Sequence, residues 1–180
     1  MKRSLMAAAC LMFAIIAVNS AYAQMGPPTP AAELRKLEMF AGDWTAEGTL
    51  TMGPPGSAPS KYSATSHGEW MEGNFFLVIH TDTDFAGTGK VKDMAVMGYD
   101  PDRKVFTYND FSSSGQNEVS TATVDGDTWT FLSDEHFGGM AMKGKFTMKV
   151  LSPTSYTMKF EMSQDGTKWM TVMDGKAMKK

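Results

Sequence analysis

Polar and apolar side chains alternate with a period of two over much of this chain, and this pattern constrains the fold more than any other feature. In residues 156–163, tyrosine, methionine and phenylalanine take one face, while threonine, lysine, glutamate and serine take the other. Residues 143–150 repeat the arrangement with glycine, phenylalanine, methionine and valine on one face. Such alternation is typical of a β-strand with one buried side and one solvated side.

Ten segments can be interpreted as strands of this kind, and most are separated by tight polar turns such as Asp125-Gly126-Asp127. Asp-Gly pairs favour hairpins because glycine readily adopts the positive φ that such turns require, so sequential strands should be antiparallel. A sheet of ten sequential strands hides its edges by closing on itself. The sequence therefore predicts an all-β fold, an antiparallel up-and-down β-barrel of about ten strands, with a two-sheet sandwich as the alternative. The segments are 44–52, 62–71, 75–84, 91–99, 105–112, 118–124, 128–133, 143–150, 156–163 and 169–173.

One short N-terminal helix is expected before the first strand. Its apolar residues Leu34, Leu37 and Phe40 recur every three positions, and Gly42 follows as a residue suited to end the helix. After Gly42 the period changes from three to two. The helix should therefore lead directly into the barrel.

The first 23 residues have the pattern of a secretory signal peptide. Lys2 and Arg3 precede an apolar run from residue 5 to residue 18, and Ala21-Tyr22-Ala23 forms a small-x-small cleavage site before Gln24. We predict a signal peptide at 1–23, a flexible leader at 24–31 rich in proline, and a single domain at 32–180. The predicted location is periplasmic or secreted, without stable membrane insertion after cleavage.

The mature chain offers little for charged partners or thiol chemistry. Of 17 basic residues, two lie in the signal segment, which leaves 15 against 20 acidic residues and no long basic run. Nucleic acid is therefore not an expected partner, because phosphate binding needs clustered lysine and arginine. The one cysteine, Cys10, also lies in the signal segment, so no disulfide is expected. The oligomeric state is left open.

No motif for covalent catalysis is present. The chain lacks a G-x-S-x-G nucleophile elbow, and the glycine-rich stretch at 87–90 precedes no helix that could bind a phosphate. The histidines His67, His80 and His136 form no zinc-binding pair with local spacing. We predict no catalytic residue, no metal ion and no cofactor, while haem or redox chemistry at His80 or His136 is kept as an alternative.

Methionine is unusually frequent, with 14 of the 17 residues in the mature chain. Many lie at alternating positions on the predicted buried face, where flexible thioethers could line an adaptable apolar cavity. A cuprous copper site is the less favoured interpretation, because aromatic residues share the same face. The candidate ligand-binding residues are His80, Met142, Phe146, Met148, Tyr156, Met158 and Phe160.

Five ordered motifs carry a resemblance to a known family: Phe40 to Trp44, Trp70 to Phe75, Gly98-Tyr99-Asp100, Asp125 to Trp129 and Ser163 to Trp169. The helix leading to G-x-W resembles the entry of calycin barrels, the lipocalin group. The whole set resembles the exported bacterial domain-of-unknown-function family numbered 1579. The resemblance implies a calycin-like barrel in which Gly42 and Trp44 are structural, and it implies no activity.

Two departures from related barrels bear on function. Lipocalins usually place a late arginine over the G-x-W tryptophan, but no arginine follows Arg103 here, so Lys176 or Lys179 should cover Trp44. Haem-binding nitrobindin barrels use a histidine from their C-terminal part, and none follows His136.

The favoured hypothesis is an exported, non-enzymatic barrel that binds a small hydrophobic or amphipathic ligand. A ten-stranded barrel encloses more space than the eight-stranded kind, which side chains can fill. The alternatives are a structural or interaction module of the cell envelope with a filled barrel, and a haem-binding or redox protein.

Overall fold

The computed structural model describes residues 28–51, 53, 57–137 and 139–180. The compact unit Ala31–Lys180 holds every helix and strand of the described residues. The predicted signal peptide and half of the predicted leader, residues 24–27, lie outside the described residues, so both stay predictions. No described helix combines the length and the apolar character needed to cross a membrane.

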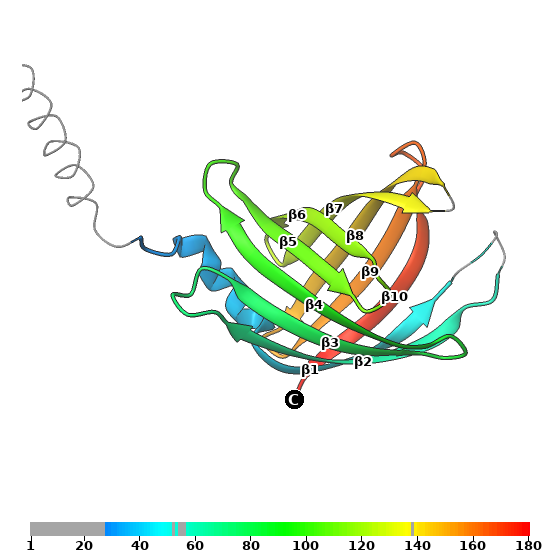
Figure 1. Cartoon of the computed structure of the whole chain (residues 1–180), viewed down its shortest axis with the longest axis horizontal. Helices are drawn as coiled ribbons and strands as arrows, with labels where there is room; N and C mark the ends of the chain where they lie inside the picture. Colours follow the sequence, from blue (N-terminus) through cyan, green and yellow to red (C-terminus); the bar gives the residue numbers. More distant parts are fainter. Residues whose placement is uncertain (1–27, 52, 54–56, 138) are drawn as a thin grey trace, which may run out of the picture. The chain divides into compact units, whose positions relative to one another are not determined.

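Ten antiparallel strands form one closed barrel, as the alternation predicted (Figure 1). Each strand pairs with its neighbours along the chain, and the first strand pairs with the last, so the described sheet has no free edge. The strands are β1 (Gly42–Leu50), β2 (Ser60–Trp70), β3 (Leu77–Phe85), β4 (Gly89–Asp100), β5 (Val105–Ser112), β6 (Asn117–Asp125), β7 (Thr128–Phe137), β8 (Met140–Ser152), β9 (Ser155–Ser163) and β10 (Met170–Lys179).

The seam between β1 and β10 uses two glycines to make room for a tyrosine. Gly48 of β1 lies opposite Gly175 of β10, and Gly48 also pairs with Tyr62 of β2. A Cβ atom at Gly175 would lie 2.2 Å from the Tyr62 Oη, and one at Gly48 would lie 2.8 Å from a ring carbon of Tyr62. The Tyr62 ring therefore lies across the seam on a surface that only glycine leaves free.

The N-terminal helix η1 (Ala32–Phe40) is a 3₁₀-helix that covers one end of the barrel (Figure 1). Because a 3₁₀-helix has three residues per turn, the period of three brings Leu34, Leu37 and Phe40 onto one face, and all three are buried. Gly68 of β2 permits close approach, since a Cβ there would lie 2.3 Å from the Phe40 carbonyl oxygen.

Aromatic rings fill the end of the barrel under η1. The Phe40 ring centroid lies 5.1 Å from that of Trp129, and Trp129 lies 4.7 Å from Phe106. Such edge and tilted contacts add to the energy of burial. This end of the interior is therefore a packed core.

The last strand is longer than predicted: it was expected at 169–173 but extends over Met170–Lys179. Pairing with β9 shifts register between Thr171 and Met173, and the small residues Gly175 and Ala177 follow on the inner face. The bulge interrupts the alternation, and small inner residues leave little apolar signal.

Leu37→Ala should lower the free energy of unfolding by about 2–5 kcal/mol, because Leu37 is fully buried and truncation leaves a cavity. Leu151→Ala is the matched control, since Leu151 is 51% exposed, and its effect should be below about 0.5 kcal/mol. Urea unfolding followed by tryptophan fluorescence measures both. Equal losses for the two variants would contradict the placement of η1 over the core.

Candidate functional site

Beyond the aromatic core, the barrel encloses a cavity of about 380 Å³. Its size falls within the range of small-molecule sites, near the lower end. Most of its wall is apolar, with side chains from β1 to β10 and from the end of η1. The wall includes Trp44, Ile79, Met97, Tyr108, Phe131, Phe146, Met148 and Met158. Wider depressions on the outer surface are edged by exposed charged groups such as Lys90 and Lys92.

Five of the seven candidate ligand-binding residues line this cavity: Phe146, Met148, Tyr156, Met158 and Phe160. Their alternation along β8 and β9 predicted the inner face of both strands. Met148 and Met158 are less than a tenth exposed. Their role in binding stays a prediction.

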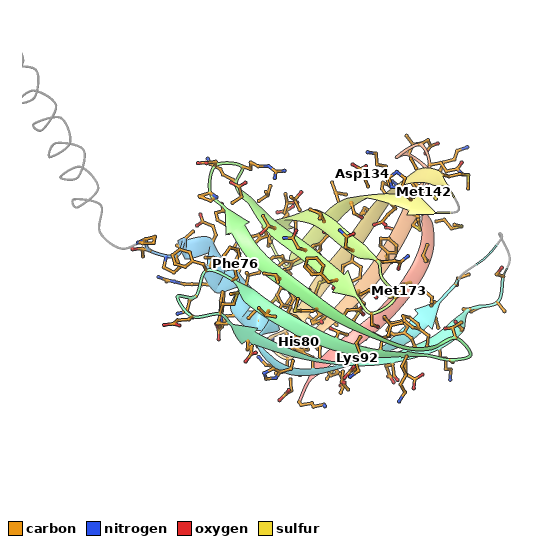
Figure 2. The ribbon with its side chains drawn as sticks, in the orientation of Figure 1. Phe76, His80, Lys92, Asp134, Met142 and Met173 are labelled. Carbon is orange, nitrogen blue, oxygen red and sulfur yellow. The ribbon has the colours of Figure 1, made fainter. Side chains whose placement is uncertain are left out.

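His80 and Met142 do not line the cavity, and for His80 this corrects the face inferred from alternation. His80 is exposed on β3 between Ile79 and Thr81, which both face inward (Figure 2). It does share a face with Phe76, but that face is the outer one, because alternation alone does not say which side of a strand turns inward. Met142 lies near the end of β8 that is far from η1 (Figure 2).

His136 is exposed on β7 and follows Glu135, which pairs with Met142 on the inner side. Neither His136 nor His80 therefore reaches the cavity, so the geometry assumed for a histidine-bound haem inside the barrel is not present. Among the described residues, no group of three or more histidine, cysteine, aspartate or glutamate side chains is arranged to hold a metal ion.

Gly42 and Trp44 lie where the chain passes from η1 into β1. Gly42 has a φ of +87°, which favours glycine, and Trp44 is only 2% exposed. The Lys179 Nζ lies 5.5 Å from the centroid of the Trp44 ring, which confirms one of the two lysines predicted to cover it. Lys176 is exposed instead. Trp44 also lines the cavity, a position that its predicted structural role did not include.

The carboxylates on the inner face were not predicted from the sequence. Asp93 of β4 and Glu118 of β6 line the cavity, and Asp110 of β5 lies directly opposite Glu118. Glu135 follows on β7, where its Oε1 accepts a hydrogen bond from Ser133. The sequence did contain a signal for this inward placement, because Asp93 and Glu118 alternate in phase with inward-facing alanines on their strands.

Burial and mutual repulsion raise the pKa values of Asp110 and Glu118. Burial, reinforced by the charge of Asp93, raises the pKa of Asp110 to about 6, although a hydrogen bond from Tyr108 opposes the rise. Burial and the charge of Glu135 also raise the pKa of Glu118. Burial raises the pKa of Tyr108 well above its ordinary value, and its hydroxyl lies 3.5 Å from the Asp110 Oδ1.

Three buried side-chain polar atoms have no hydrogen-bond partner among the described residues, and all belong to inward-facing side chains. They are the Trp44 Nε1, the Tyr62 Oη and the Ser120 Oγ. Trp44 and Tyr62 line the cavity, and Ser120 precedes Ala122 on the inner face of β6. Because buried polar groups in proteins are nearly always hydrogen-bonded, three exceptions on one internal surface mark it as a place for polar contacts.

Asp110→Asn should stabilise the protein at neutral pH. The folded-state pKa of about 6 exceeds the ordinary 3.8, so protonation stabilises the fold at low pH, and this contribution is lost as the pH rises through about 6. The variant has no carboxyl group to ionise at this position. Its free energy of unfolding in urea, relative to that of the parent, should therefore increase between pH 4.5 and pH 7.5. Asp125→Asn, at an exposed position of β6, is the control. A constant difference across this range would contradict the buried setting of Asp110.

Comparison with solved structures shows the fold. Rv2717c from M. tuberculosis has 16% sequence identity and a TM-score of 0.57, and the match covers 84% of this chain and 99% of that one. The S-type phycobiliprotein lyase CPES from Guillardia theta has 9% identity and a TM-score of 0.55, with 83% and 93% covered. No curated protein matches the sequence. A family model matches residues 29–179, so the chain belongs to the family described as protein of unknown function (DUF1579).

Proposed function

We propose that this protein binds one small amphipathic molecule inside its barrel and performs no covalent chemistry on it. The cavity of about 380 Å³ carries the proposal, because its wall is mainly apolar yet contains a few buried polar atoms without protein partners. Binding sites for small molecules commonly combine an apolar wall with a small number of polar groups.

The apolar wall supports binding of varied molecules. Removing apolar surface from water contributes about 25 cal/mol per Å², so a buried hydrocarbon group supplies most of the affinity. Met97, Met148, Met158 and Met173 all line the cavity, and methionine adjusts its shape at low cost. This composition favours recognition by shape and apolar character over recognition of one rigid molecule.

The state of the titratable groups beside the cavity supports binding over catalysis. Tyr108 and Asp110 are the hydrogen-bonded titratable pair on the inner face, but the pKa of Tyr108 is raised well above its ordinary value. A phenol held in its neutral form is a poor nucleophile and a poor base.

Ile79→Trp should weaken binding of a neutral lipophilic dye such as N-phenyl-1-naphthylamine at least about tenfold. Ile79 lines the cavity, so the larger ring occupies space that the dye needs. His80→Trp is the matched control, because the neighbouring side chain is exposed on the outer face and should leave binding unchanged. Fluorescence titration measures both variants, with circular dichroism as the check on folding.

Saturable binding to the parent protein and to His80→Trp, but not to Ile79→Trp, is the expected result. Native mass spectrometry of protein purified from its own host should also show a copurified small molecule. No saturable binding to the folded parent would overturn the proposal.

We also propose that the protein acts outside the cytoplasm. The signal-peptide pattern of residues 1–23 supports this. The mature protein should begin at Gln24 when recovered from the periplasm or medium and analysed by N-terminal sequencing. An N-terminus at Met1 in all recovered protein would contradict export.

One observation favours the second candidate, an interaction module. Exposed apolar side chains lie on the outer face of neighbouring strands: Met94 of β4, Phe111 of β5, Val119 of β6 and Leu132 of β7. Contiguous apolar surface of this kind can mark a contact with another protein. Unimpaired function in the host after Ile79→Trp, together with loss of function after Leu132→Asp, would favour this candidate over ligand binding.

A further inference from the structure

We propose that the bound molecule is an organic cation with an apolar tail, and that its positive group lies among Asp93, Asp110 and Glu118. This inference rests on the proposed function and specifies its ligand class. A protonated amine or a guanidinium group would meet the requirement. The tail would extend along the apolar wall of the same cavity.

The three carboxylates occupy one part of the inner face. Asp110 and Glu118 are directly opposite on neighbouring strands, and Ala95, two residues from Asp93, pairs with Asp110. Like charges placed opposite each other on a sheet repel, so this arrangement destabilises the free protein. The inner face therefore holds a concentration of negative charge that the fold itself does not require.

The lysines that form ion pairs with carboxylates of β3 and β7 do so outside the barrel. Lys90 pairs with Asp84, Lys92 with Asp82 and Lys143 with Asp134. Within the described residues, no ion pair reaches Asp93, Asp110 or Glu118. Burying a carboxylate without a partner is costly, and a cation supplied by a ligand would remove that cost.

Buried polar atoms without a partner among the described residues are an independent indication of a ligand, and two of them, the Trp44 Nε1 and the Tyr62 Oη, line the same cavity. The third lies beside the carboxylates. Ser120 is 4% exposed, and its hydroxyl faces Glu118 closely enough to limit the rise in the pKa of that carboxyl. Even so, the Ser120 Oγ makes no hydrogen bond of ordinary geometry to any described residue. An ammonium or guanidinium group donates several hydrogen bonds and could serve this oxygen and the carboxylates together.

The cavity wall also divides by polarity. The side chains that line it from β8, β9 and β10 are Phe146, Met148, Tyr156, Met158, Phe160 and Met173, with no carboxylate among them. Asp93 and Glu118 line the side formed by β4 and β6. A molecule with a charged head and an apolar tail matches this division. The carboxylates are not arranged as a metal-binding group, so an organic cation is favoured over a metal ion.

Three probes with the same ten-carbon chain test the inference: decylamine, decanol and decanoate, each kept below its micelle concentration. At pH 7.5 they carry a positive, a neutral and a negative head. Isothermal titration calorimetry with the parent protein should show decylamine binding at least about tenfold more tightly than decanol, and decanoate most weakly.

Two variants locate the head group. Asp110→Asn and Glu118→Gln should each weaken decylamine binding about tenfold or more, and should weaken it much more than they weaken decanol binding. Asp125→Asn is the matched control, because it removes the same charge from an exposed position of β6 and should change neither affinity. An equal effect of all three variants on decylamine would show general electrostatic attraction and overturn the site.

The pH dependence supplies a second measurement. Because the pKa of Asp110 is about 6, decylamine affinity should rise as the pH increases from 5 to 7.5, while decanol affinity stays constant. The groups that face Asp110 are Asp93, Tyr108 and Glu118. Tyr108 stays neutral in this range because its pKa is raised, and the raised pKa of Glu118 acts in the same direction as that of Asp110. In the Asp110→Asn variant, this pH-dependent rise in decylamine affinity should be smaller.

The outcomes separate this inference from the proposed function. Equal affinity for decylamine, decanol and decanoate would overturn the cation and leave barrel binding intact. No binding of any of the three probes, together with no saturable dye binding to the folded parent, would overturn both.

Discussion

Pairing between β1 and β10 is the contact on which the rest of the structure depends. It runs from Trp44 opposite Lys179 to Leu50 opposite Met173 and converts a ten-stranded sheet into a barrel. Closure removes the exposed edges and gives each strand one inner and one outer face. The glycine pair in this seam gives Tyr62 room to lie across both strands, so the seam is also part of the cavity wall.

The two parts of the interior have different roles. Under η1, apolar helix residues and aromatic rings form a dense core that supports the fold. Elsewhere on the inner face, buried carboxylates carry a cost in stability, and three buried polar atoms of the interior have no hydrogen-bond partner among the described residues. Proteins tolerate such local cost where a binding site requires it, so the balance between a stable end and a strained interior is itself consistent with a ligand.

Much of the site was predictable where alternation was uninterrupted. Phe146, Met148 and Phe160 lie on the inner face because their strands alternate cleanly between apolar and polar residues. His80 was misplaced because β3 carries polar residues on both faces, so its inward side could not be identified from periodicity. Alternation could have placed Glu118 on the inner face, but only strand register shows that it lies opposite Asp110.

By itself, the sequence determined the strand number, the antiparallel order, the short helix with its apolar period of three before Gly42, and the family of the barrel. These properties are local, since each depends on side-chain period and turn residues within a short segment. The tertiary structure alone decided which face of β3 turns inward, which lysine covers Trp44 and which carboxylates share the cavity. These are set by closure and register, which join residues far apart in the chain.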